Sequence, residues 1–419
     1  MQLKENIKQL KPSATLAIND HSNELIIQGK KVYKLGFGQS PFPVPNEVVK
    51  ELVLHAHEKD YLPVKGLPGL RAAISAYQQN RFGMDCTWED VIVGPGSKEL
   101  LYIAQLCCEG DLILPAPSWV SYAPQAHLTN KKSIWIDTAE HVKRMLDAEM
   151  LERTCKAYSD KKLILILNYP SNPTGASFSE SELRSIADIA RKNQILIISD
   201  EIYGELMHNG KHLSIARYYP EGTIVSSGIS KWCGAGGWRL GTFTFPKELR
   251  WLLDAMAVVA SETFTATSTP IQYAAVKAYE FGPSIEYYVQ KSRAILKIVS
   301  QFVYNELLSI GLSMPSPQGG FYLFPDFKNF KTQLKTKGVN TSFELCKKLL
   351  EETGVALLPG SDFGQHPEEL SARLSYVDFD GKKALALSDD HLDLNHIKEI
   401  CPNVVDACEQ IKNWLLEIK

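Results

Sequence analysis

Short, nearly continuous runs of hydrophobic residues recur between about residues 90 and 245, and segments of helical pattern separate several of them. Runs this short, in which almost every position is apolar, are typical of strands buried on both faces, as in a mostly parallel sheet. We interpret the following runs as strands: 91–93, 112–114, 134–136, 163–167, 195–198, 223–225 and 242–245.

One of the segments between these runs, 177–193, has the pattern of an amphipathic helix. Ser179 and Glu182 have the spacing of a capping box, and Leu183, Ile186 and Ala190 lie on one helical face. A strand, a helix and a second strand in succession form the βαβ unit, whose strands are parallel. The sequence therefore predicts an α/β fold with a mostly parallel, seven-stranded sheet flanked by helices.

After residue 285 strand-like and helical segments occur in groups rather than in alternation. This grouping predicts a smaller α+β domain, on which the N-terminal segment packs because about forty residues are too few to fold alone. We predict a large domain at 45–285 and a small domain made of 1–44 and 286–419, and assign no element to 380–402. The small domain's predicted helices are 285–310, 343–350 and 405–418, and its predicted strands are 319–324, 355–358 and 372–376.

The charge of the chain is nearly balanced, with 45 Lys and Arg against 48 Asp and Glu, which gives a net charge of −3. This balance argues against nucleic acid as the main partner. No apolar run reaches the roughly 18 residues that span a bilayer, and the first residues lack the apolar segment of a secretory signal. The eight cysteines form no CxxC pair and no zinc-type cluster with histidines. We therefore expect a cytoplasmic protein with reduced thiols, no metal site, and no nucleic-acid or membrane partner.

Polar residues of several kinds follow the predicted strands. The carboxyl ends of parallel strands meet at one edge of a sheet, where ligands bind, so we expect these side chains to share one crevice. After the first run, the segment 94–98 holds Gly96, Ser97 and Lys98 before a predicted helix, and backbone N–H groups there suit a phosphate. The candidates after the other strands are Trp119, Asn172, Asp200, Tyr203, Ser230, Lys231 and Arg239.

Taken singly, these features have simpler explanations. A Gly-Pro-Gly is commonly a turn, an Asp after a strand is commonly a helix cap, and a single Lys is commonly a solvated charge. A lone Trp is commonly part of the core or its rim. These simpler explanations do not account for the placement of all these features at one crevice.

Two familiar nucleotide-binding motifs do not fit. The P-loop motif GxxxxGK[ST] fails because the Gly-Lys pairs at 29–30, 210–211 and 381–382 are followed by Lys, His and Lys. The nicotinamide fingerprint GxGxxG fails after both Gly94 and Gly234. The sequence contains no HExxH, GxSxG or EF-hand pattern either, so metal hydrolysis and serine hydrolysis have no support.

The candidate residues together fit an aromatic cofactor that carries a phosphate, a pyridine nitrogen and an aldehyde. A lysine forms a Schiff base with an aldehyde. An aspartate beside the ring nitrogen keeps that nitrogen protonated, so that the ring accepts electrons. A Tyr hydroxyl and an Asn amide can hydrogen-bond the ring oxygen, an indole can stack on the ring, and an Arg can pair with the phosphate in bidentate fashion.

In these residues the chain resembles the pyridoxal-phosphate-dependent aminotransferases of fold type I, class I/II. The resemblance extends from about residue 10 to residue 380, and its motifs occur in the family's order and spacing. It implies the fold of that family and a homodimer with shared active sites. The segments that carry it are 61–71, 94–98, 117–119, 172–175, 199–203, 230–231 with 237–239, and 373–376.

The resemblance also implies how the cofactor is held. Lys231 is the Schiff-base lysine and the proton carrier, Asp200 pairs with the pyridine nitrogen, and Tyr203 and Asn172 contact the ring oxygen. Trp119 stacks on the ring and also borders the substrate. The phosphate contacts implied by the resemblance are Gly96, Ser97, Lys98, Ser230 and Arg239, with Tyr61 reaching in from the partner subunit.

For the substrate, the resemblance implies that Arg373 binds the α-carboxylate, helped by Gly38 and Asn172. The opening segment 10–19 is similar to that of the bacterial aspartate aminotransferase subgroup, in which a threonine and the phosphate-loop lysine bind the distal carboxylate. Thr15 and Lys98 occupy those positions here. An exposed residue in the first helical turn is an equally good interpretation of Lys98.

The expected activity is transfer of an amino group from aspartate, or another dicarboxylic or aromatic amino acid, to 2-oxoglutarate by a ping-pong mechanism. A β-lyase or decarboxylase on the same fold is the alternative, and no residue excludes it. The chain departs from the subgroup at 38–42, where it reads Gly-Gln-Ser-Pro-Phe instead of Gly-Glu-Pro-Asp-Phe, and in the length of 380–402. It also has Gly228 at a position that is often serine.

The resemblance implies, finally, that two proline turns at the strand ends aim Trp119 and Asn172 into the crevice. The resemblance also implies that both the Ala116–Pro117 and the Asn172–Pro173 bonds are cis, a form found in only about 5–6% of X–Pro bonds.

Overall fold

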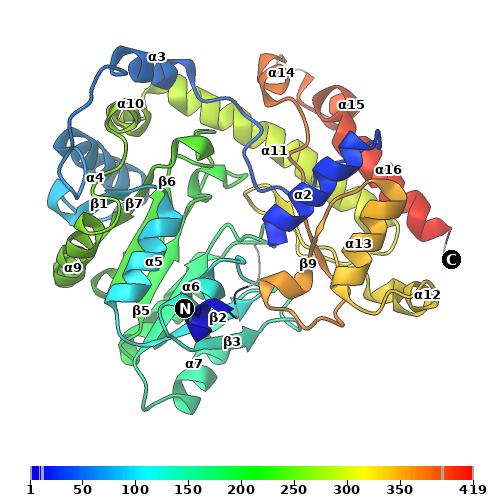
Figure 1. Ribbon diagram of the computed structural model, residues 1–419, viewed down its shortest axis with the longest axis horizontal. Coiled ribbons are helices and arrows are strands. Elements are labelled where there is room, and N and C mark those ends of the chain that lie inside the picture. The colour runs from blue at the N-terminus through cyan, green and yellow to red at the C-terminus, as the bar shows by residue number, and fades with distance from the viewer. Residues whose placement is uncertain (1, 9, 11–13, 388–390, 418–419) are drawn as a thin grey trace.

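A computed structural model describes residues 2–8, 10, 14–387 and 391–417, and its core is a seven-stranded sheet in the order β1-β7-β6-β5-β4-β2-β3 (Figure 1). β7 runs antiparallel to both of its neighbours, and the other pairs are parallel. All the predicted strands of the large domain are present, so the predicted α/β sheet is confirmed. The strands are β1 (Val91–Gly94), β2 (Asp111–Ala116), β3 (Ser133–Asp137), β4 (Leu163–Asn168), β5 (Leu196–Asp200), β6 (Thr223–Gly228) and β7 (Gly241–Thr244).

Helices cover both faces of this sheet, which explains why its strands are apolar at nearly every position. Leu112 and Leu114 of β2 pack with α5, α6 and α9, whereas Ile113 packs with α7 and α8. The capping box predicted for α8 is present: the Ser179 hydroxyl accepts from the backbone N–H of Glu182. These helices are α5 (Ser97–Cys107), α6 (Tyr122–Leu128), α7 (Ala148–Ala157), α8 (Glu180–Lys192) and α9 (Arg250–Ser261).

The C-terminal part contains a three-stranded antiparallel sheet in the order β8-β10-β9. Its strands are β8 (Tyr322–Leu323), β9 (Leu358–Pro359) and β10 (Ala372–Ser375), within the predicted runs or one residue beyond them. The long helix α11 (Pro283–Ser309) crosses from the helices beside the large sheet to those of the C-terminal part (Figure 1). One hydrophobic cluster contains residues of both parts and therefore does not separate them. The predicted division of the chain at 285/286 stays a prediction.

The remaining helices complete both parts. In the stretch 380–402, for which the sequence predicts no element, the described residues form two short helices and a 3-10 turn, and they pack on α11. None of the described helices is long and apolar enough to cross a membrane. The eight cysteines are free thiols. The helices that complete the two parts are α1 (Glu5–Lys8), α2 (Ala14–Ile27), α3 (Asn46–Leu54), α4 (Pro68–Phe82), α10 (Thr269–Glu280), α12 (Lys331–Thr336), α13 (Ser342–Thr353), α14 (Gly381–Ala386), α15 (Ile397–Ile400) and α16 (Pro402–Leu416).

An ion pair joins the segment after β3 to the C-terminal part. The Arg144 guanidinium donates to Asp326 Oδ2 at 2.8 Å and to Gln365 Oε1 at 3.0 Å, and its side chain is only 10% exposed. Replacing Arg144 with alanine leaves a nearly buried Asp326 carboxylate without its cation. We expect Arg144→Ala to lower the free energy of unfolding by about 3 kcal/mol, measured by urea denaturation.

Arg153→Ala is the matched control for this prediction. Arg153 pairs with Glu149 at 3.3 Å, but both side chains are well exposed. An exposed pair one helical turn apart contributes only about 0.5 kcal/mol. Equal losses for the two variants would show that the Arg144 pair contributes no more than a surface pair.

Candidate active site

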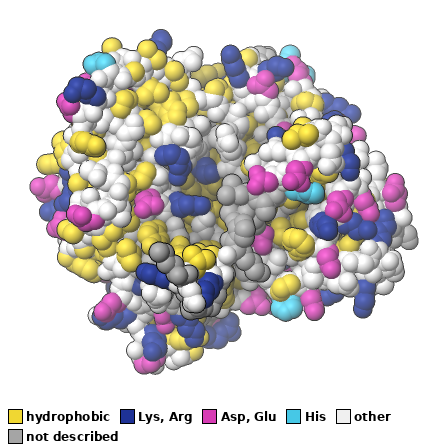
Figure 2. All heavy atoms as spheres, viewed as in Figure 1, with side chains coloured by type: hydrophobic (Ala, Val, Ile, Leu, Met, Phe, Trp, Pro, Cys, Tyr) yellow, Lys and Arg dark blue, Asp and Glu magenta, His cyan; other side chains and the backbone are white. Residues whose placement is uncertain are grey.

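A cavity of about 580 Å³ opens at the carboxyl ends of β4, β5 and β6. Figure 2 shows basic side chains gathered in the hollow between the two halves of the molecule. Most of the residues singled out in the sequence line this cavity, although they come from distant parts of the chain. They are Gly38, Ser97, Lys98, Trp119, Asn172, Asp200, Tyr203, Ser230, Lys231, Arg239 and Arg373.

Asp200 is a buried carboxyl group at the last position of β5. The Tyr122 hydroxyl donates to its Oδ2 at 2.6 Å. Burial raises the pKa of Asp200 to about 6, and the hydrogen bond from Tyr122 opposes this shift. A carboxylate in such a place is stabilised by a cationic partner, and a protonated ring nitrogen is one.

Lys231 follows β6 and faces Asp200 and Tyr203 across the cavity. Its Nζ donates to the carbonyl oxygen of Gly38 at 2.5 Å and lies 5.6 Å from the centre of the Tyr203 ring. Burial lowers the pKa of Lys231 to about 8, and the neighbouring Arg373 cation contributes to this shift. A lysine with a lowered pKa is a better nucleophile and proton carrier at neutral pH.

The N-terminus of α5 and Arg239 form a cradle for an anion. Gly96 precedes the helix at φ +92°, and a Cβ on it would overlap the Arg239 guanidinium. A Cβ on Gly241 would likewise overlap the backbone nitrogen of Ser97. The glycines therefore let a cationic side chain approach the free N–H groups of a helix N-terminus, which is a favourable site for phosphate.

Gly228 is explained by the same close packing. A Cβ at this position would lie 2.7 Å from the carbonyl oxygen of Leu240 in the neighbouring chain segment. A serine would therefore not fit here without a backbone shift.

Arg373 reaches the cavity from β10 and is only 2% exposed. Its Nη1 donates to Asn172 Oδ1 at 3.1 Å and its Nη2 to the Gly36 carbonyl oxygen at 2.6 Å. Its Nε is buried without a hydrogen-bond partner among the described residues. A guanidinium pairs strongly with a carboxylate, so Arg373 suits a carboxylate bound in the cavity that it lines.

Lys98 lies at the rim of the cavity beside Trp119. Its Nζ is 5.1 Å from the centre of the indole ring, and partial burial together with the Arg239 cation lowers its pKa. The side chain is exposed to solvent and also lines the cavity, so both interpretations of Lys98 describe part of its position.

Two candidates stand apart from the cavity lining. Gly96, which precedes Ser97, shapes the anion cradle but does not line the cavity. Tyr61 is 90% exposed on the surface of the single chain, so its predicted reach into a partner subunit stays a prediction. The side chain of Thr15 lies outside the described part of the chain.

Two tyrosines that the sequence analysis did not single out contact the candidate residues. Tyr122 hydrogen-bonds Asp200, and the Tyr322 hydroxyl lies 2.8 Å from that of Tyr203. Tyr322 sits in an otherwise apolar strand, where a buried hydroxyl needs a partner. This need for a hydrogen-bond partner is the feature of the sequence that could have pointed to Tyr322. Among the described residues, no three His, Cys, Asp or Glu side chains come together to hold a metal ion.

One of the two predicted cis bonds is correct. Ala116–Pro117 is cis, but the second cis bond is Tyr169–Pro170, and Asn172–Pro173 is trans. Asn172 is placed instead by its backbone N–H, which donates to Asn168 Oδ1 at 2.7 Å. The turn contains two prolines, and the sequence pattern did not show which of them carries the cis bond.

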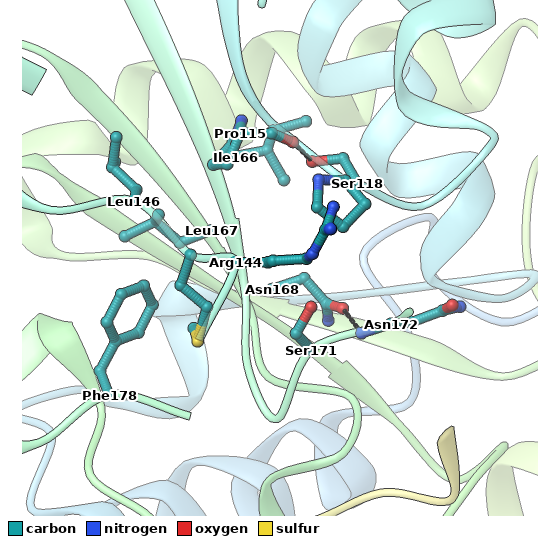
Figure 3. Close-up of a pocket in the computed structure, with 12 residues that line it drawn as sticks. Pro115, Ser118, Arg144, Leu146, Ile166, Leu167, Asn168, Ser171, Asn172 and Phe178 are labelled. Atoms are coloured by element: carbon teal, nitrogen blue, oxygen red, sulfur yellow. Dashed lines mark hydrogen bonds between the residues drawn. The ribbon is translucent and has the colours of Figure 1, made fainter. Parts of the chain in front are cut away.

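A second cavity, of about 20 Å³, lies behind Asn168 and Asn172, which line both cavities. Figure 3 shows the Arg144 side chain crossing it between Ser118 and Asn168. A space of this size holds roughly one water molecule. The larger cavity is therefore the candidate ligand site. Among the described residues that line it, four side chains are cationic, Lys98, Lys231, Arg239 and Arg373, against the single carboxyl of Asp200, which suits a ligand with several negative charges.

Comparison with known proteins agrees with this geometry. The pattern of the family "Aminotransferase class I and II" matches residues 30–380. Aspartate aminotransferase of Geobacillus stearothermophilus is 35% identical over 387 residues, which cover 90% of this chain and 95% of that protein. Asparagine–oxo-acid transaminase of Streptococcus mutans is 34% identical over the same length and the same shares. The solved structure of Thermus thermophilus aspartate aminotransferase with maleate has a TM-score of 0.84 at 27% identity, covering 99% of each chain.

Proposed function

The chain belongs to the class I and II aminotransferases, which use pyridoxal phosphate, and from this premise we propose that it moves the amino group of a dicarboxylic L-amino acid, foremost aspartate, to 2-oxoglutarate. The observation that carries the proposal is the set of cations. With Arg239 assigned to the cofactor phosphate, Arg373 and Lys98 remain as one partner for each carboxylate of the substrate. The Thermus relative was solved with maleate, itself a dicarboxylate, which supports this choice.

The residues of the cavity fit pyridoxal phosphate. Ser97, Ser230 and Arg239 would hold the phosphate at the N-terminus of α5, and Asp200 would pair with the ring nitrogen. The ring oxygen would be hydrogen-bonded by Tyr203 and Asn172, and the ring face covered by Trp119. When bound, the cofactor supplies an aromatic ring that takes up the electron pair released at the substrate α-carbon.

Lys231 is assigned to bind the cofactor aldehyde and to move the proton at the substrate α-carbon. With a pKa of about 8, its amine is neutral in roughly a tenth of the molecules at pH 7. An ordinary lysine is neutral in fewer than roughly one molecule in a thousand at that pH. The Gly38 carbonyl, which accepts from Nζ, holds the side chain toward the cavity.

Arg373 is assigned to the α-carboxylate that all amino-acid substrates share. Asn172 and the Gly36 carbonyl hold two of its nitrogens, so the guanidinium is oriented before substrate arrives. Because the group is deeply buried, a carboxylate paired with it is shielded from water and strongly bound.

We further propose that the enzyme is a homodimer with active sites shared between subunits. Hydrophobic side chains gather over the region of α3 and α10 (Figure 2). Val53 of α3 and Trp251 and Val258 of α9 are each at least 60% exposed. Exposed apolar surface of this kind is typical of a protein interface. In that dimer Tyr61, which is 90% exposed on the single chain, would reach the phosphate of the other subunit.

The substrate assignment is tested by Lys98→Ala. A lysine is a point charge without the planar fork of arginine, so its discrimination should be on the order of 5- to 150-fold. We expect kcat/KM for aspartate and glutamate to fall by that factor, while alanine and phenylalanine change little. Asparagine should be affected less than aspartate, because its amide oxygen accepts a hydrogen bond without carrying a charge. The measurement is a panel of amino donors assayed with 2-oxoglutarate.

Arg373→Ala is the control in this panel, and it should impair every donor because all share the α-carboxylate. Equal losses for acidic and neutral donors in Lys98→Ala would mean that the lysine serves only the phosphate loop, and the aspartate assignment would then lose its support. Turnover without 2-oxoglutarate would favour the alternative of a β-lyase or decarboxylase.

A further inference from the structure

Tyr322, the first residue of β8, contacts three of the assigned residues without having a role in the mechanism so far. Its side chain is 1% exposed and lines the cavity. We propose that Tyr322 is a positioning residue with two separable effects. Its hydroxyl strengthens the hydrogen bond that Tyr203 gives to the cofactor, and its ring orients Arg373 toward the substrate carboxylate. This inference rests on the proposed function, because it presupposes the roles assigned to Tyr203 and Arg373.

The hydroxyl effect follows from the contact between the two tyrosines. Their hydroxyl oxygens are 2.8 Å apart, and their rings meet edge to face with centres 5.5 Å apart. Only one of the two hydroxyls can donate across this contact. If Tyr203 donates to the cofactor ring oxygen, Tyr322 must be the donor and Tyr203 the acceptor. A hydroxyl that accepts a hydrogen bond becomes a stronger donor itself.

Gly38 provides the space in which the Tyr322 hydroxyl lies. A Cβ at Gly38 would overlap that hydroxyl oxygen. The carbonyl of the same glycine accepts from Lys231. The segment around Gly38 therefore contacts both the proton carrier and the tyrosine pair.

The ring effect follows from the position of Arg373 close to two aromatic rings. Its guanidinium carbon lies 4.7 Å from the centre of the Tyr322 ring and 5.1 Å from that of Phe363. The cation is attracted to each ring, and contact with both rings restricts the orientation of the guanidinium. The two hydrogen bonds to Asn172 and Gly36 then determine which edge of the group faces the cavity.

Backbone contacts on two sides fix the segment that carries Tyr322. Within the small sheet it pairs with Ser375 of β10, two positions after Arg373. On the other side, the Gly320 N–H donates to the Leu206 carbonyl at 3.0 Å, in the turn that follows Tyr203. Tyr322 therefore connects the strand that carries Arg373 with the strand end that carries Tyr203.

The test uses two variants of the holoenzyme and two readouts other than turnover. Tyr322→Phe removes the hydroxyl and keeps the ring, whereas Tyr322→Leu removes both. The readouts are the pKa seen in the absorbance of the bound cofactor and the dissociation constant of maleate, a dicarboxylate that cannot react. Tyr376→Phe is the matched control, because this buried tyrosine follows β10 and its hydroxyl donates to the Gly320 carbonyl at 3.2 Å rather than to Tyr203 or Arg373.

We expect Tyr322→Phe to raise the pKa of the chromophore by roughly half a unit to one unit, because a weaker hydrogen bond from Tyr203 leaves more negative charge on the ring oxygen. Its maleate affinity should stay within about twofold, since the ring that stacks on Arg373 remains. Tyr322→Leu should show the same pKa shift and bind maleate roughly 5- to 30-fold more weakly. Tyr376→Phe should leave both values unchanged.

The proposal is wrong if the chromophore pKa of Tyr322→Phe equals that of the wild-type enzyme, or if Tyr322→Leu binds maleate normally. If Tyr322→Leu is not folded, Tyr322→Met, which fills similar volume without a ring, takes its place. A wild-type protein without a cofactor chromophore or transamination would contradict the proposed function instead. The two failures are therefore distinguishable.

Discussion

Lys231→Ala is expected to lower kcat/KM for transamination by at least about 10⁴-fold, the upper range for a positioned proton-transfer group, because the same residue also attaches the cofactor. The Lys231 amine is the one assigned both to the cofactor aldehyde and to the proton at the substrate α-carbon. The wild-type protein should be yellow, and borohydride should fix the cofactor to the peptide that contains Lys231. The variant should show no such attachment. The measurements are the initial rate with 2-oxoglutarate and the mass of the labelled peptide.

Lys156→Ala is a suitable control, since this lysine is 72% exposed on α7 and is not among the residues that line the cavity. It should retain the wild-type rate and labelling. A Lys231→Ala variant that kept both the colour and a near-normal rate would contradict the mechanism. The same variant with normal labelling at another lysine would assign the role to that residue.

Asp200→Ala is expected to retain the cofactor and to lose activity by a factor on the order of 10²–10⁴. Retention follows from the anion cradle of Arg239 and α5, which does not involve Asp200. The loss follows because a ring nitrogen without a carboxylate partner is not kept protonated, and the ring then takes up electrons poorly. Cofactor content and rate are measured on the same sample. An undiminished rate would remove Asp200 from this role.

The same carboxyl should make the cofactor-free protein less stable at high pH. Folding raises the pKa of Asp200 to about 6, from about 3.9 in an unfolded chain. A carboxyl group with a raised pKa contributes its full stability only below the unfolded value, and that contribution is lost as the pH rises through the folded value. Asp200→Asn should therefore raise the free energy of unfolding of the cofactor-free protein by up to about 3 kcal/mol at pH 8 and change it little near pH 4. Equal effects at the two pH values would contradict this account.

The strands of the large sheet could be predicted because each one is a continuous apolar run. Leu112, Ile113 and Leu114 illustrate the reason: successive side chains of one strand enter two different hydrophobic clusters, one on each face of the sheet. Such a pattern is local in the sequence and therefore visible without a structure. The stretch 380–402 could not be assigned, because its helices are short and their positions depend on packing against α11.

Most of the candidate site was predictable for a related reason. Asp200 and Lys231 each follow a predicted strand, and the ends of parallel strands meet at one edge of the sheet. The order of the strands was not predictable in this way, since β7 is inserted between β1 and β6. That order brings Gly241 against Ser97 and so completes the anion cradle.

The sequence by itself determined the strands, the βαβ connection and the set of polar residues at the strand ends, because hydrophobic periodicity and turn residues act over a few neighbouring positions. The tertiary structure alone decided which distant side chains meet. The hydrogen bond of Tyr122 to Asp200, the contact of Tyr322 with Tyr203 and the hydrogen bond of Arg373 to Asn172 join residues 78, 119 and 201 positions apart. Which proline bond in a two-proline turn is cis was decided at the same level. These features depend on how the two sheets pack around the cavity, and no local pattern in the chain specifies that packing.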